Sequence, residues 1–265
     1  MNKRGQVTIF IIIGIAIVII GIILFFVMRP SGTPELSKDI NPNEYLSECV
    51  FGKVEPYVKL ISERGGYLEP EFFIMHEKEN ELIKVQYLCY ASGSYTNCTN
   101  QRPMLREFIE EQLIENTHAT VKEKCIDKFR QYAEENGFEV QLSQFDKEDY
   151  EILTEFSQIK INLRLDITIT KGTATKNFKN FEFVKDSYFG GQIIVAEEVV
   201  NDETHCYGDT KNPEEYMNRA SFDSWLTMEK IRNSDGTRIY ILTDRSTENE
   251  FIFAIRSCYT PGGFL

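Results

Sequence analysis

The sequence has few of the residues, and none of the spacings, that build familiar catalytic or metal sites. Its three histidines are far apart, and no pair fits a His-Glu-x-x-His motif. No two of its six cysteines have the Cys-x-x-Cys spacing of a zinc ribbon or a thioredoxin-type redox centre. The Gly-x-Ser-x-Gly motif and the glycine-rich phosphate loop are missing as well. We therefore predict that the protein is not an enzyme and binds no cofactor and no metal.

Basic residues are scarce in most of the chain. Lys3, Arg4 and Arg29 are the only charged residues before Pro30. Residues 30–265 therefore contain 26 of the 29 Lys and Arg and all 41 Asp and Glu. That part of the chain therefore has a net charge of −15. Because nucleic-acid binding depends on neutralising phosphates with Lys and Arg, this balance excludes nucleic acid as a partner.

Apolar residues are concentrated in one uncharged run, from Val7 to Met28. A helix of these 22 residues is about 33 Å long, which is enough to cross a bilayer. A cleaved secretory signal has a shorter apolar core of about 7–15 residues, so we expect a retained anchor. Lys3 and Arg4 favour a cytoplasmic amino terminus, which places the rest of the chain outside the cell. Membrane lipid is thus the first predicted partner.

The chain divides into three predicted parts. Residues 1–28 form a basic cytoplasmic tip and the membrane helix. Residues 29–43 form a stalk, since two prolines and a glycine interrupt the helix there. Residues 44–265 form the extracellular domain, and whether a C-terminal subdomain begins near residue 185 is left open.

The run Lys3-Arg4-Gly5-Gln6-Val7-Thr8-Ile9-Phe10 resembles the class III, type IV pilin-like signal of archaeal proteins. In that family a prepilin-type peptidase cuts after the glycine and leaves the apolar helix at the new amino terminus. The resemblance implies a processing site between Gly5 and Gln6. Pilins commonly carry Glu at the fifth mature position, where this sequence has Phe10. A pilin-like subunit of an extracellular filament is therefore the alternative interpretation, behind a plain anchor.

The whole chain resembles a group of uncharacterised archaeal membrane-anchored surface proteins that open with the same segment. The shared features are a Cys-bearing first helix at Cys49, the turn Gly65-Gly66-Tyr67, a Tyr-rich strand and a second Cys-bearing helix at Cys125. The resemblance implies a cell-surface location and brings no known activity.

We therefore predict a non-enzymatic, single-pass membrane-anchored cell-surface protein with a structural or interaction role. Its expected partners are membrane lipid and either another surface protein or a second copy of itself. An extracellular enzyme with a site assembled from distant residues is the second alternative, since sequence spacing does not test for such a site.

Hydrophobic periodicity predicts helices and strands without a regular strand-helix-strand repeat. The predicted helices are 44–64, 103–135 with an interruption near 116–119, and 188–200. The predicted strands are 71–75, 82–90, 138–142, 159–169, 178–184 and a hairpin of 238–243 with 251–258. This order favours an α+β fold with a mainly antiparallel sheet and packed helices.

All six cysteines follow the predicted anchor, and an exterior location favours three disulfides, for which fifteen connectivities exist. Local position favours one of these connectivities. Cys89 and Cys98 flank a Ser-Gly-rich turn, and Cys49 and Cys125 lie on the apolar stripes of two helices. The remaining two, Cys206 and Cys258, are then left to pair with each other.

The turn after residue 90 carries two further candidate features. Asn97-Cys98-Thr99 is an Asn-x-Ser/Thr sequon, which predicts N-glycosylation of Asn97. Tyr87, Tyr90 and Tyr95 cluster around the same turn. Exposed tyrosines beside a rigid loop can make a recognition surface, but packing in the core or at an interface explains most aromatic residues and is the favoured interpretation.

One local cluster combines metal-ligating residue types. His205 and Cys206 lie close to Asp202, Glu203 and Asp209. We interpret this segment as an acidic, solvated loop, and we assign no ligands to it.

Overall fold

The computed structural model describes residues 40–93, 95–206, 213–217 and 224–258. The predicted membrane helix at 7–28, the processing site at Gly5 and Gln6 and most of the stalk at 29–43 lie outside these residues. Among the helices that are described, none is both long and apolar enough to cross a membrane.

The first helix, α2, spans Pro42–Glu63 and confirms the predicted helix with a start two residues earlier. The side chain of Asn41 accepts a hydrogen bond from the amide of Asn43, and Pro42 fits the first helical turn because its missing N–H needs no partner there. The helix ends at Gly65 and Gly66, both with positive φ, where the amide of Gly66 donates to the carbonyl of Ile61.

The next helical segment is continuous. It consists of α3 (Leu105–Val121), a π-helical turn (Lys122–Ile126) and α4 (Asp127–Glu135). The interruption expected near 116–119 is wrong, because the polar side chains there bond within the helix. Thr117 donates to the carbonyl of Leu113, and Asn116 donates to the carbonyl of Gln112. The irregular turn lies at the residues around Cys125 instead.

The first sheet is antiparallel and has four strands, β4 (Glu139–Leu142), β5 (Tyr150–Glu155), β6 (Gln158–Lys171) and β7 (Ala174–Asp186), and the other three all pair with β6. The first half of β6 pairs with β5 and the second half with β4, while β7 pairs along its whole length except at a bulge. The alternation in 159–169 is confirmed, since Ile161, Leu165 and Ile167 are fully buried. Strand β5 was not predicted.

The second sheet contains strands from both ends of the described chain. Its members are β1 (Phe73–Lys78), β2 (Glu81–Tyr90), β3 (Thr99–Asn100), β8 (Leu226–Arg232), β9 (Thr237–Asp244) and β10 (Glu250–Arg256). The strand order is β1-β2-β10-β9-β8, and β3 pairs with β2. The predicted hairpin of β9 and β10 is confirmed, but β2 runs parallel to β10, so the fold is α+β with one mixed sheet. Strands from before and after residue 185 therefore lie side by side.

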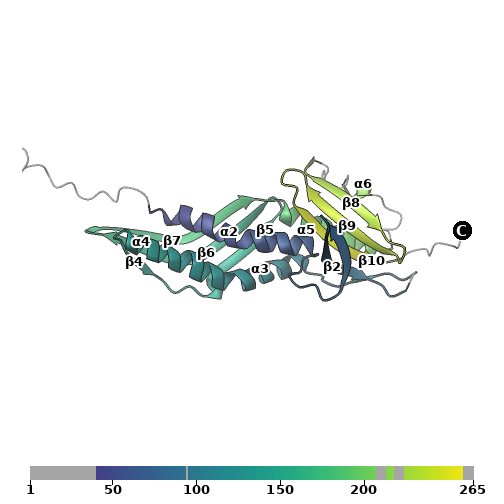
Figure 1. Cartoon of the computed structure of the whole chain (residues 1–265), viewed down its shortest axis with the longest axis horizontal. Coiled ribbons are helices and arrows are strands. Elements are labelled where there is room, and N and C mark those ends of the chain that lie inside the picture. Colours follow the sequence, from purple (N-terminus) through teal and green to yellow (C-terminus); the bar gives the residue numbers. More distant parts are fainter. Residues whose placement is uncertain (1–39, 94, 207–212, 218–223, 259–265) are drawn as a thin grey trace, which may run out of the picture.

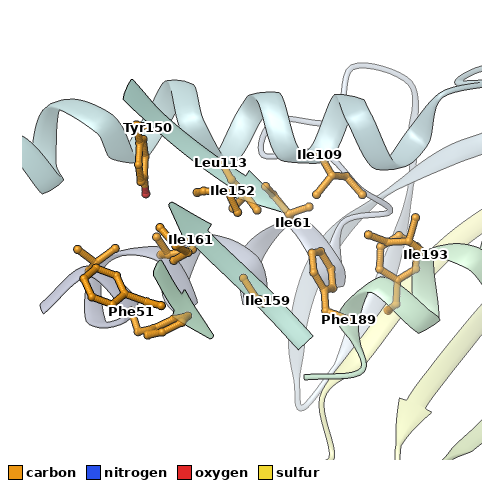
Figure 2. Close-up of a cluster of buried hydrophobic side chains, with 14 of the residues drawn as sticks. Phe51, Ile61, Ile109, Leu113, Tyr150, Ile152, Ile159, Ile161, Phe189 and Ile193 are labelled. Atoms are coloured by element: carbon orange, nitrogen blue, oxygen red, sulfur yellow. The ribbon is translucent and has the colours of Figure 1, made fainter. Parts of the chain in front are cut away.

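The main hydrophobic core extends through the body (Figure 2). Side chains of α2 and α3 meet those of β5 and β6, and α5 (Phe189–Glu203) continues the core toward the second sheet. The short helix α6 spans Pro213–Met217 and contacts β8. In Figure 1 the body is elongated, with the start of α2 toward one end and the second sheet toward the other.

Two glycines allow α5 to approach the first sheet closely. The predicted helix 188–200 is confirmed despite Gly190 and Gly191, which lower intrinsic helix propensity. A Cβ on Gly190 would collide with the carbonyl oxygen of Glu155, and a Cβ on Gly191 would lie 2.8 Å from the ring of Trp225. Close packing, not backbone flexibility, therefore requires glycine at both positions.

Candidate functional site

The structure joins all six cysteines in the three pairs that sequence position favoured, and no cysteine is free. The bonds are Cys49–Cys125, Cys89–Cys98 and Cys206–Cys258. The first connects α2 to the π-helical turn, the second closes the turn between β2 and β3, and the third connects the turn after α5 to the chain beyond β10. Two of the three therefore brace the second sheet.

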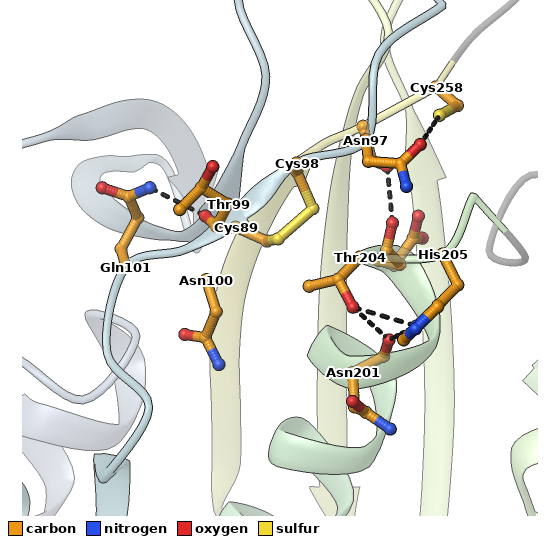
Figure 3. The surroundings of a disulfide bond; sticks show 12 residues. Cys89, Asn97, Cys98, Thr99, Asn100, Gln101, Asn201, Thr204, His205 and Cys258 are labelled. Atoms are coloured by element: carbon orange, nitrogen blue, oxygen red, sulfur yellow. Dashed lines mark hydrogen bonds between the residues drawn. A yellow bond between two sulfur atoms is a disulfide. The ribbon is translucent and has the colours of Figure 1, made fainter.

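Asn97 lies between two of these disulfides (Figure 3). Its side-chain oxygen is 2.8 Å from Sγ of Cys206 and 3.6 Å from Sγ of Cys258, while its neighbour Cys98 is bonded to Cys89. Asn97 and Thr99 are both exposed. The sequon is therefore accessible, and its position against the Cys206–Cys258 bond could be found only from the tertiary structure.

The three tyrosines of this region do not share one exposed surface. Tyr87 is 7% exposed, and its hydroxyl lies 3.1 Å from Oγ1 of Thr237, while burial raises the pKa of Tyr87. Tyr90 is half-buried and accepts a hydrogen bond from Arg256. Tyr95 alone is well exposed, at 69%. The interpretation of a three-tyrosine surface is thus wrong, because Tyr87 and Tyr90 pack against Phe72.

The histidines lie on separate elements. His76 is on β1. His118 is on α3, and its ring stacks on that of Phe145. His205 follows α5, and its Nδ1 is 2.9 Å from the carbonyl oxygen of Asn201. Within the described ranges no group of three or more His, Cys, Asp or Glu side chains could hold a metal ion. Asp209 lies outside those ranges.

The acidic, solvated loop expected after residue 200 is wrong for two of its members. Asp202 and Glu203 belong to the last turn of α5, and both are buried. The helix continues because Glu203 bonds to Arg238 and Tyr240 of the second sheet. These residues are distant in the sequence, so a local pattern does not predict the contact.

Glu203 is the centre of a buried polar network. One carboxylate oxygen is 2.7 Å from Nη2 of Arg238, and the other accepts a 2.5 Å hydrogen bond from the hydroxyl of Tyr240. The side chains of Glu203 and Arg238 are 0% and 3% exposed. Ser257 donates to the backbone carbonyl of Glu203, and burial together with the adjacent carboxylate holds the pKa of Tyr240 far above its usual range. The network joins the end of α5 to β9 beside the Cys206–Cys258 bond.

A groove of about 440 Å³ lies between α2, the end of β7, the start of α5 and the turn after β9. Its lining is mainly apolar, and two of its polar side chains bond to neighbouring groups. Lys185 pairs with Glu55, and Gln192 donates to the carbonyls of Leu242 and Asn249. The arrangement stabilises the junction of the elements and leaves Lys185 and Gln192 engaged with other protein groups.

A carboxylate of α5, that of Glu197, lies near the start of α3. Burial raises the pKa of Glu197, and this effect outweighs the opposing effects of the charge of Arg106 and of the amides of Leu105 and Arg106.

Comparison with protein-family models, with curated proteins and with solved structures gives no match for this chain.

Proposed function

We propose that this chain is a single-pass membrane-anchored protein of the cell exterior, whose disulfide-braced body has a structural or interaction role and no catalytic one. The observation that carries the proposal is the pairing of all six cysteines, each of which follows the apolar run 7–28 in the sequence. Disulfides persist in oxidising compartments and are rare in the cytosol. A braced body behind an uncharged segment of bilayer length fits a tethered exterior protein.

The elongated shape of the body indicates which end a tether would hold away from the membrane. A tether in front of α2 would hold the first sheet and its helices near the lipid, and the second sheet away from it (Figure 1). The turn between β2 and β3 would then be far from the membrane, with Tyr95 and Asn97 exposed. We assign the contact with a surface partner to this end, and the disulfide Cys89–Cys98 limits the entropy that ordering the turn would cost.

The anchor is tested by fractionating cells that express the full chain. We expect the protein to remain in the membrane pellet after an alkaline carbonate wash. The matched variant replaces residues 1–28 with a cleavable secretory signal, and it should be recovered as a soluble exterior protein with the same three disulfides. Release of the full chain by the wash would contradict the anchor, and alkylation of its thiols without reductant would contradict the exterior location.

Amino-terminal sequencing addresses the pilin-like alternative. A mature chain that begins at Gln6 supports processing after Gly5, whereas an intact Met1 contradicts processing. Microscopy of native membranes then separates a tether from a filament subunit.

N-glycosylation of Asn97 is part of the same proposal. We expect Asn97→Gln to remove a glycan mass from the mature protein. Asn100→Gln, three residues along and outside the sequon, is the matched control and should leave the mass of the glycan unchanged. An unmodified Asn97 in protein isolated from native membranes would exclude the glycan.

A further inference from the structure

A second groove, of about 560 Å³, lies between α2 and α3 and is independent of the proposed tether. Its walls come from the C-terminal half of α2, the segment between α2 and β1, α3, and Arg102 just before α3. Its volume is within the range of small-molecule sites, about 300–1,000 Å³. Its side chains are mainly aromatic, amide and arginine, in a body whose net charge is negative.

Arg102 is held in this groove by aromatic residues. Its Nε donates a 3.0 Å hydrogen bond to the hydroxyl of Tyr67, and its guanidinium carbon lies 3.9 Å from the ring centroid of Phe108. The backbone amide of Arg102 donates to Oδ1 of Asn100. These contacts orient the guanidinium plane and leave both terminal nitrogens for a further acceptor. No ion pair in the described parts of the chain includes Arg102, although acidic residues outnumber basic ones.

A second guanidinium lines the same groove on a stable turn. Nη1 of Arg64 donates to the carbonyl of Leu68 at 2.6 Å. The side chain of Gln112 holds this turn from both sides, since it donates to the carbonyl of Gly66 and accepts from the amide of Leu68. The groove is therefore preorganised, and two arginines line it, a residue type suited to binding a planar anion.

The surrounding groups limit the class of anion. Glu69 and Glu71 are exposed at the edge of the groove and would repel a phosphate polymer or any other highly charged ligand. Carboxylates accept hydrogen bonds from hydroxyl groups, and Tyr57 offers a half-buried ring and a hydroxyl. A ligand with one carboxylate, several hydroxyls and a flat apolar face matches all of these groups.

We propose that this groove binds an acidic sugar, with Arg102 and Arg64 receiving its carboxylate, Tyr57 contacting the ring face, and Glu69 and Glu71 accepting hydrogen bonds from its hydroxyls. Arg102 is the residue on which affinity depends most, because its orientation is fixed before the ligand arrives.

The test is an NMR titration of the full-length chain with sodium D-glucuronate and with D-glucose, which differ only in the carboxylate. We expect saturable shifts at Gly66, Leu68 and Gln112 with glucuronate, and at least tenfold weaker binding of glucose. Sodium acetate at the same ionic strength should also bind at least tenfold more weakly than glucuronate. Equal affinity for glucuronate and glucose, equal affinity for glucuronate and acetate, or no shift at these amides would overturn the proposal.

Arg102→Gln should weaken glucuronate binding at least tenfold, to the level of glucose. Arg130→Gln is the matched control, because Arg130 is an exposed arginine of α4 that pairs with Asp127, and it should change nothing. Should Arg102→Gln fail to fold, Tyr57→Ala provides the second measurement, with a loss for glucuronate and none for acetate. Unchanged glucuronate affinity in a folded Arg102→Gln protein contradicts the assignment.

Discussion

The two sheets of this protein are stabilised in different ways. The first sheet is built from contiguous residues, 139–186, and one of its faces is polar, with cross-strand pairs such as Lys160–Glu182. The second combines residues 73–100 with residues 226–256, and β10 buries side chains on both faces. Ile252 of β10 belongs to a small outer cluster, and Phe253 belongs to the main core.

The difference shows what each sheet needs in order to form. A sheet whose strands are close in sequence forms from local alternation and short connections, so residues near one another in the chain specify it. The second sheet must bring together segments more than 120 residues apart, and it carries two disulfides and the Glu203–Arg238 pair at one end. The predictions below compare the crosslinks of the second sheet with contacts in the rest of the body.

The largest expected effect comes from removing disulfides. The bond Cys49–Cys125 closes a sequence separation of 76 residues, and Cys89–Cys98 closes one of 9. The loop-entropy relation gives a loss of about 4.5 kcal/mol for the paired Cys-to-Ser substitutions at the first bond and about 2.7 kcal/mol at the second. Denaturant unfolding of each double variant measures the losses. Equal losses would show that loop closure does not set the contribution of these bonds.

Breaking the buried ion pair should have a similar effect. Arg238→Met leaves the Glu203 carboxylate buried without its cation, which costs about 3–5 kcal/mol. Arg130→Met, which breaks the exposed pair with Asp127, should cost less than about 1 kcal/mol. Urea unfolding compares the two variants. If they lose the same amount, the network around Glu203 does not stabilise the second sheet.

Substitutions at two helical glycines should change the free energy of unfolding by smaller amounts. Gly190→Ala should destabilise by about 1–3 kcal/mol, because the added methyl meets the backbone of Glu155. Gly52→Ala on α2 has open space around its Cβ and should stabilise by about 0.5–1 kcal/mol through helix propensity. Thermal unfolding gives both values. A stable Gly190→Ala protein would mean that α5 does not need its close contact with β5.

The smallest expected effect is a pH dependence at Glu197. Burial raises its pKa above the ordinary 4.5, so the folded protein retains the proton more strongly than the unfolded chain. The resulting stability is fully present below pH 4.5 and is lost as the pH rises through the folded pKa. Glu197→Gln mimics the protonated form and should lose less stability than the unmodified protein as the pH rises above 4.5. Midpoints of thermal unfolding measured from pH 4 to pH 8 show this as a widening difference.

The matched control for that series is Glu198→Gln, which removes one negative charge from the same helix. If both variants show the same widening difference, net charge and not the burial of Glu197 is responsible.

Much of the fold followed from periodicity. Helix α2 and strand β6 were predicted because each repeats apolar residues at one clear spacing over a long stretch, and the hairpin of β9 and β10 was predicted because two apolar runs flank a polar turn. Strands β5 and β8 were missed, since each mixes apolar with charged residues and is recognised only by its pairing with a neighbour. The parallel pairing of β2 with β10 has no local signal at all.

The candidate sites divide in the same way. The three disulfides could be inferred because each cysteine lies in a segment with a clear helix, turn or loop character. The partners of Glu203 could not, because Arg238 is 35 positions away and nothing in its own segment distinguishes it from a solvated arginine. Arg102 was missed for the same reason, since its orientation depends on Tyr67 and Phe108.

The sequence by itself determined the charge balance, the apolar run at 7–28 and the elements with long periodic patterns, and it favoured the cysteine pairing that the structure has. Composition and local pattern are enough to predict these properties. Only the tertiary structure decided that Asp202 and Glu203 are buried and that Tyr87 and Tyr90 pack against other side chains. It also decided that Tyr67 and Phe108 orient the guanidinium of Arg102 in a groove. The environment of a polar side chain depends on what folds against it, and the neighbours in question come from distant parts of the sequence.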